Sequence, residues 1–426
     1  MTAFTPKPEP DFSELAKQLP SGAHIVIHSD FAEPVALAKL LAEQAEAFSG
    51  MHLHTLMPMA PPAYAEEAAA QHIQVETFFP GGGLRRAVNQ GLAKARRCSL
   101  SDIPQFFSGG EISASLLLLQ VSMPNEQGQV SLGISVDYMR EVLAQDPIVV
   151  VQINPQMPFT LGNTLLDWAD IDYAIDCEQP LLSFPEAKAD PVDTAIAQHV
   201  ATLVQDGDVI QAGIGALPDA VLANLGHLKD LGAHTGILTA AWLPLIEKGV
   251  VNNRLKERFT GQCITTMAGG DADFYHYLDN NEAIAFHPIA LTHDFGTLSA
   301  IENLCAINSV LQIDLSARAN AEVANGRLIS TPGGLPDFAR GATAAKGGKS
   351  IIALRSSFKD GAVSNIVISL ATDVPVSIDG SMITHVVTEY GVAEISNLSG
   401  RALAEALIAI AHIDHRDTLL QALNNE

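Results

Sequence analysis

The chain has 426 residues, 47% of them hydrophobic and 17% charged, and its 24 basic and 48 acidic residues give a formal net charge of -24 at pH 7. This length and composition are typical of a globular protein with two or three domains. The negative charge repels nucleic acid and anionic membrane surfaces, so we expect neither as a partner. A site for a phosphate-bearing ligand must then be built locally, from backbone N–H groups and a few basic side chains.

The cysteines and the N-terminal residues indicate a cellular compartment. The cysteines, at 98, 177, 263 and 305, lie far apart without metal-binding spacing, as isolated thiols do in a reducing environment. The N-terminal segment carries prolines and acids in place of the basic start and apolar run of a signal peptide. No apolar run reaches the roughly 18 residues of a membrane-spanning helix. We therefore expect a cytoplasmic protein without a metal site.

Short runs rich in β-branched residues alternate with alanine- and leucine-rich helical patterns along the whole chain. Strands are expected over 24–28, 116–122, 147–153 and 351–357. Strands that alternate with helices predict parallel sheets covered on both faces. The pattern restarts after a polar, proline-marked stretch at 178–191. We therefore predict an α/β protein of two similar open domains, over residues 1–185 and 186–426.

Two glycine-containing turns follow expected strands in the second half. In the first, Gly213-Ile214-Gly215-Ala216 lets a ligand approach the backbone closely and exposes N–H groups to an anion. A purely structural turn would explain these glycines equally well. The second turn contains Gly333 and Gly334, and Lys349 follows it. Both turns should lie at the carboxyl edge of the sheet, where open α/β folds bind ligands. The segment at 347–350 lacks the loop length of a phosphate-binding P-loop, which disfavours a kinase-like enzyme.

Many ordered motifs connect the chain to a known family. They include SLGISVDY (131–138), QINPQMPFTLG (152–162), GIGALPDAV (213–221), INSVLQIDL (307–315), GGLPDFARGA (333–342) and VVTEYGVAEI (386–395). The chain resembles the acetyl-CoA hydrolase/transferase family, especially the 4-hydroxybutyrate CoA-transferases, and the resemblance is collinear over nearly the whole chain. It implies two tandem CoA-transferase-type domains with the active site at their interface. It also implies a coenzyme A thioester as substrate, a small acyl-CoA and a carboxylate as partners, and no tightly bound cofactor; a homo-oligomer is compatible with the sequence.

The resemblance also assigns site residues. Family members transfer CoA through a glutamate that attacks the thioester, forms an anhydride and becomes a glutamyl thioester. The position of that glutamate is occupied here by Gly236, in His-Thr-Gly. The turn residues Gly215, Ala216, Gly333 and Gly334 are expected to surround the reaction. Coenzyme A is expected to contact the same glycines and, in addition, Gly213, Ile214, Lys349 and Glu389.

Three departures from the family pattern put ordinary transfer in doubt. Glycine at 236 cannot form an anhydride, Phe159 replaces an arginine, and a second arginine is missing before the VVTEYG motif. A hydrolase could hold water in an opening left by the glutamate side chain. A transferase could have moved its nucleophile, with Asp271, Asp273, Glu247 and Glu257 as candidates. The alternative is a catalytically silent CoA-binding or regulatory homologue.

The main local concentration of positive charge comes early in the chain. It consists of Arg85, Arg86, Lys94, Arg96 and Arg97, and we expect it to span one helix. Such a helix could contact the phosphates of coenzyme A, although a solvated helix face explains it as well.

Overall fold

The computed structural model describes residues 5–184, 188–359 and 361–425. The chain forms two compact units. The first comprises Met1–Phe184 with Ile264–Thr292, and the second comprises Pro185–Cys263 with His293–Glu426. The sequence-based ranges 1–185 and 186–426 treat the two halves as consecutive, whereas the first unit also takes a segment from the second half.

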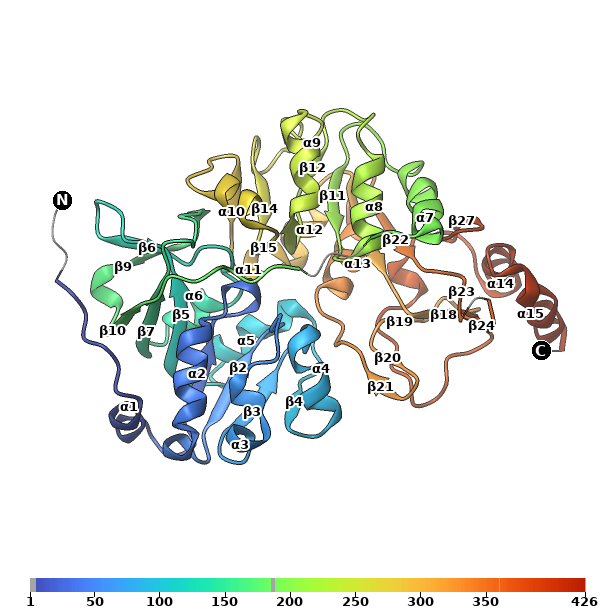
Figure 1. Ribbon diagram of the computed structural model, residues 1–426. Helices are drawn as coiled ribbons and strands as arrows, with labels where there is room; N and C mark the ends of the chain where they lie inside the picture. Colours follow the sequence, from blue (N-terminus) through green and yellow to red (C-terminus); the bar gives the residue numbers. More distant parts are fainter. Residues whose placement is uncertain (1–4, 185–187, 360, 426) are drawn as a thin grey trace. The chain divides into compact units, whose positions relative to one another are not determined.

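The first unit is built on a seven-stranded parallel sheet in the order β10-β7-β5-β1-β2-β3-β4 (Figure 1). Its strands are β1 His24–Ile27, β2 His52–Thr55, β3 Gln74–Thr77, β4 Ala93–Ala95, β5 Ala114–Val121, β7 Ile148–Ile153 and β10 Tyr173–Asp176. Its longer helices are α1 Phe12–Gln18, α2 Val35–Glu43, α4 Gly81–Asn89, α5 Ile103–Ser108 and α10 Ala272–Leu278. The shorter ones are α3 Glu67–Ala70, α6 Met139–Leu143 and α11 Ile289–Thr292. Short pairings add β6 Gln129–Ser131 with β9 Leu165–Asp167, and β8 Leu161–Gly162 with β16 Ile284–Phe286.

Burial explains why these segments are strands. All four leucines at 116–119 in β5 are inaccessible to solvent, as expected for a central parallel strand covered on both faces. The strands expected at 24–28, 116–122 and 147–153 are confirmed as β1, β5 and β7.

The basic run does not span one helix, contrary to our expectation. Helix α4 ends at Asn89, and Lys94 lies in strand β4. Arg96 follows that strand and donates to the carboxylate of Glu76 at 3.0 Å. The run therefore does not present a single charged helix face.

The second unit contains a six-stranded sheet in the order β12-β11-β17-β22-β26-β27 (Figure 1). Neighbouring strands are parallel from β12 to β26, and β27 is antiparallel to β26. The strands are β12 Gly232–Ala233, β11 Val209–Ala212, β17 Leu304–Ser309, β22 Lys349–Ala353, β26 His385–Thr388 and β27 Gly391–Glu394. The expected strand at 351–357 is thus β22, displaced by two residues at its start and ending earlier.

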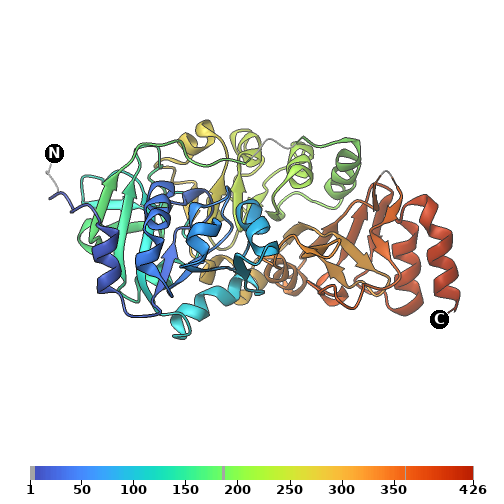
Figure 2. The same cartoon turned by 60° about the horizontal axis from the view of Figure 1, so that its bottom comes forward.

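Helices cover this sheet, and short hairpins lie at its carboxyl edge. The helices are α7 Pro191–Ala201, α8 Ala216–Asn224, α9 Leu243–Glu247, α12 Phe295–Ser299, α13 Leu335–Ala344, α14 Gly400–Ala409 and α15 Ile413–Asn425. Helix α7 packs on α8, α12 packs on α13, and α14 packs on α15 near the C-terminus (Figure 2). The hairpins are β20 Val323–Ala324 with β21 Arg327–Leu328, and β23 Ser357–Phe358 with β24 Val363–Ser364. Strand β18 Gln312–Asp314 pairs with β19 Ala319–Asn320 and β25 Ile366–Val367.

The register of the central strands brings their ends together. Ala212 at the end of β11 is opposite Ile307 of β17, and Ser309 at the end of β17 is opposite Ala353 at the end of β22. Strands β11, β17 and β22 therefore finish at one edge, and the loops that follow them can form a common site.

Both units have the predicted α/β architecture. Among the described residues, no helix combines the length and the apolar character needed to cross a membrane. The part of the chain that the structure describes also has no group of three or more His, Cys, Asp or Glu side chains arranged to hold a metal ion.

Candidate active site

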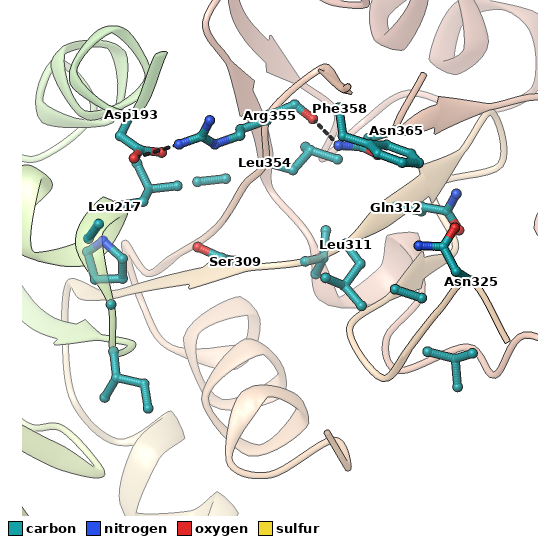
Figure 3. A pocket seen from close by; sticks show the side chains of 18 residues that line it. Asp193, Leu217, Ser309, Leu311, Gln312, Asn325, Leu354, Arg355, Phe358 and Asn365 are labelled. Carbon is teal, nitrogen blue, oxygen red and sulfur yellow. Dashed lines mark hydrogen bonds and ion pairs between the residues drawn. The ribbon is translucent and has the colours of Figure 1, made fainter. Parts of the chain in front are cut away.

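A cavity of about 420 Å³ lies in the second unit at the carboxyl ends of β11, β17 and β22 (Figure 3). A volume of this size suits a small molecule or part of a larger one. Its walls come from four places in the sequence: residues 214–218, 309–312, 323–325 and 353–358, with Asp193 and Asn365.

The first wall is the turn from β11 into α8. Gly215 precedes α8 with φ 111°, a conformation that residues with a Cβ rarely adopt. This glycine lets the chain turn from the strand into the helix, and the first two residues of α8, Ala216 and Leu217, line the cavity. N–H groups in a first helical turn have no partner within the helix and attract negative charge.

The other walls combine apolar side chains with amides. Leu217, Leu354 and Phe358 contribute apolar surface, whereas Gln312 of strand β18 and Asn325 of the turn between β20 and β21 contribute side-chain amides (Figure 3). Such a lining suits a ligand that has both apolar segments and hydrogen-bonding groups.

Arg355 is the one basic side chain among the described residues that line the cavity. Its guanidinium donates to Asp190 at 2.8 Å and to Asp193 at 2.7 Å, and these ion pairs raise its pKa. Its carbonyl oxygen accepts a hydrogen bond from the Asn365 amide at 2.9 Å. Arg355 therefore connects the loop after β22 with the start of α7, and 41% of its side chain stays exposed.

Glu389 holds the same loop, the one after β22, through hydrogen bonds to Ser356. Its carboxylate accepts hydrogen bonds from the N–H of Ser356 at 2.9 Å and from the Ser356 hydroxyl at 2.6 Å. Because Ser356 directly follows Arg355, Glu389 positions a wall of the cavity without lining it.

The predicted ligand-contacting residues do not all meet at this cavity. Ile214, Gly215 and Ala216 line it. Gly213 lies one residue earlier, beside the amide pair in which Gln211 and Asn308 exchange hydrogen bonds at 3.2 and 2.8 Å.

The remaining predicted residues are not part of its lining. Lys349 is at the amino end of β22, away from the edge where the cavity lies, and pairs with Asp208 at 2.7 Å. Gly333 and Gly334 lead into α13. The roles of Lys349, Gly333 and Gly334 in ligand binding remain predictions.

Gly236 has an environment that the sequence did not indicate. A Cβ atom on Gly236 would lie 2.9 Å from Nε2 and 3.1 Å from Cε1 of His293, and 3.6 Å from Cε2 of Phe338. The expected opening beside residue 236 is therefore filled by an imidazole. Burial lowers the pKa of His293 to about 3, so the ring is neutral.

The candidate replacement carboxylates have exposed positions: Glu247, Glu257, Asp271 and Asp273. Asp271 borders a second cavity, of about 470 Å³, in the first unit. Its side chain accepts a hydrogen bond from the N–H of Phe274 at 2.9 Å and so caps α10. This capping role explains Asp271 without chemistry.

Comparison with known proteins identifies the family of this chain. Residues 8–184 match the acetyl-CoA hydrolase/transferase N-terminal domain, and residues 270–423 match the corresponding C-terminal domain. The 4-hydroxybutyrate coenzyme A transferase of Clostridium kluyveri is 33% identical over 93% of both chains. The chain belongs to the acetyl-CoA hydrolase/transferase family.

Two solved structures have the same fold as this chain. RipA from Yersinia pestis matches with a TM-score of 0.91 at 30% identity, covering 97% of this chain and 96% of that one. A 4-hydroxybutyrate CoA-transferase from Porphyromonas gingivalis matches with a TM-score of 0.83 at 28% identity, covering 98% and 97%. The family resemblance and the two-domain CoA-transferase fold expected from the sequence are confirmed.

None of the cavity residues outside the first glycine turn was predicted. The segments 309–312 and 353–358 each follow a central strand of the sheet, and this position was the signal that could have indicated them. The hairpin residues 323–325 carry no such signal in the sequence.

Proposed function

We propose that this protein acts on acyl-CoA thioesters, as a CoA-transferase or an acyl-CoA hydrolase, and holds coenzyme A in the cavity of the second unit. The observation that carries this proposal is the position of the cavity at the carboxyl ends of β11, β17 and β22, beside the start of α8. Coenzyme A is a substrate in this proposal and not a resident cofactor.

The proposed roles of the residues follow from their chemistry. The N–H groups at the start of α8 stabilise negative charge, either on a phosphate or on the thioester oxygen as the carbonyl is attacked. Leu217, Leu354 and Phe358 contact the apolar parts of the pantetheine arm, and Gln312 and Asn325 bind its amides. Arg355 and Glu389 position the loop that carries this wall.

The substrate class is proposed from the relative with the 4-hydroxybutyrate name. A small acyl-CoA, of the acetyl or 4-hydroxybutyryl type, is the proposed donor, and a small carboxylate is the proposed acceptor. We place this reaction in the cytoplasm.

A second function is favoured by one specific observation. A Cβ atom on Gly236 would lie 2.9 Å from Nε2 of His293, so the imidazole takes the space in which a nucleophilic side chain at position 236 would begin. This crowding supports a catalytically silent homologue that binds CoA and regulates or pairs with another protein.

One experiment separates these functions. The purified protein is incubated with acetyl-CoA, with and without butyrate, and the products are measured by liquid chromatography and mass spectrometry. Butyryl-CoA indicates transfer, free CoA without butyrate indicates hydrolysis, and saturable CoA binding without either product indicates a silent homologue. Failure to bind CoA would contradict all three.

A pair of matched variants tests whether coenzyme A binds in the cavity of the second unit. Ala324→Trp places an indole in the wall of the cavity and should abolish CoA binding. Ala402→Trp places the same side chain on the exposed surface of α14 and should leave binding unchanged.

A further inference from the structure

The space around Gly236 is closed by side chains and not by the backbone conformation of the glycine. Gly236 does not have the positive φ that excludes other residues, unlike Gly215. Its neighbour Thr235 lies with its hydroxyl 3.2 Å from the carbonyl oxygen of Ala212, at the end of β11. A residue with a Cβ could therefore adopt this backbone, but its Cβ would come within 3.0 Å of the His293 ring.

The ring of His293 has little freedom to move away. His293 is 1% exposed, and Phe338 is 2% exposed. Their ring centroids are 4.9 Å apart with the planes at 66°. The imidazole is thus enclosed by other side chains. The ring atoms that approach Gly236, Nε2 and Cε1, are at the end of the His293 side chain.

The backbone on both sides of this ring pair is also fixed. Asp294, the residue after His293, caps α12 by accepting a hydrogen bond from the N–H of Thr297 at 2.6 Å. Phe338 belongs to α13, which packs on α12 where Gly341 closely approaches Leu298. A shift of the backbone at His293 would therefore disturb the cap of α12.

We propose that His293 is a plug: its imidazole occupies the space of a side chain at position 236, so a carboxylate nucleophile can be accommodated there only if residue 293 is shortened as well. The proposal deepens the proposed function, because it rests on position 236 being the place of the nucleophile. It makes His293 a residue that determines which reaction the site can support.

The plug predicts a defined chemical outcome for a double substitution. In Gly236→Glu/His293→Ala, a carboxylate oxygen would attack the thioester carbonyl, the C–S bond would break, and CoA would leave as a thiolate. The thiolate would then attack the glutamyl carbonyl of the anhydride and release the acyl group as a carboxylate. The protein would retain a glutamyl-CoA thioester, which mass spectrometry detects.

The steric part is tested by thermal unfolding of four proteins: wild type, Gly236→Ala, His293→Ala and the double variant. Gly236→Ala should lower the unfolding midpoint by several degrees in the wild-type background and by much less in the His293→Ala background. Gly226→Ala is the matched control, because Gly226 has ordinary φ and no atom within 4 Å of its added Cβ. The plug is overturned if Gly236→Ala is no more destabilising than Gly226→Ala, or equally destabilising in both backgrounds.

The chemical part is tested with acetyl-CoA and mass spectrometry of the intact proteins. We expect an adduct at residue 236 in Gly236→Glu/His293→Ala and none in Gly236→Glu. Equal adducts in both variants would overturn the plug. A folded double variant that binds CoA but forms no adduct would count against position 236 as the place of the nucleophile. The thermal unfolding of the four proteins described above would then decide whether His293 is a plug.

Discussion

Arg355 and Asp193 join the cavity wall to helix α7: the guanidinium of Arg355 donates to Oδ2 of Asp193 at 2.7 Å. Asp193 is 5% exposed and stands in the first turn of α7, whereas Arg355 follows β22. The pair therefore connects two elements 162 residues apart in the sequence at the edge of the proposed CoA site.

Arg355→Ala should weaken CoA binding several-fold and also lower stability. Arg355 is 41% exposed, but Asp193 is 5% exposed, so the substitution leaves a nearly buried carboxylate without its cation. Removing the guanidinium also releases the loop that forms one wall and removes the basic side chain of the cavity. Isothermal titration with CoA measures the affinity, and Arg401→Ala, which breaks a surface pair with Glu405, is the control. Equal affinities of the two variants would contradict a role for Arg355 in binding.

Gly215→Ala should impair both stability and binding. The combination of φ 111° and ψ -179° is nearly restricted to glycine, so an alanine there would be strained by roughly 1–3 kcal/mol. The strain should displace the N–H groups at the start of α8 and raise the dissociation constant for CoA. Gly226→Ala again serves as the control, and chemical denaturation with CoA titration measures both effects. An unchanged dissociation constant would show that the start of α8 does not bind the ligand.

Glu389 and Ser356 should act as a coupled pair. Glu389→Ala and Ser356→Ala each remove the hydrogen bond between the two side chains, so their effects on the CoA dissociation constant should not add in the double variant. A double-mutant cycle on CoA affinity measures this coupling. Strictly additive effects would indicate that Glu389 acts independently of Ser356.

Glu33 should make the first unit less stable at alkaline pH. Its side chain is 4% exposed, and burial raises its pKa from 4.5 to about 8. Between these values the folded protein keeps the proton while the unfolded chain has lost it, so stability falls as pH rises from about 4.5 to 8. Glu33→Gln should remove this pH dependence. Its gain in the free energy of unfolding over wild type should be largest above pH 8.

Urea denaturation at several pH values measures the dependence on Glu33. Glu126→Gln, at an exposed loop position, should leave the pH profile unchanged. A Glu33→Gln profile parallel to wild type would show that Glu33 is not protonated in the folded state.

The sequence by itself determined the local features of this protein. The β-branched and leucine-rich runs at 24–28, 116–122 and 147–153 form buried strands. Their side chains are apolar on both faces of the sheet, and the helices that alternate with them along the chain cover those faces. Gly215 before α8 was also identifiable, since a strand that turns at once into a helix needs a residue that tolerates positive φ. The ordered motifs were sufficient to establish the family.

Only the tertiary structure decided which residues meet. The cavity combines segments from residues 214–218, 309–312, 323–325 and 353–358, and only the parallel register of β11, β17 and β22 aligns their ends. His293 lies 57 residues from Gly236, and no periodicity in the sequence relates them. Their approach depends on the packing of α12 on α13, which fixes the imidazole beside the glycine through contacts distant in the chain.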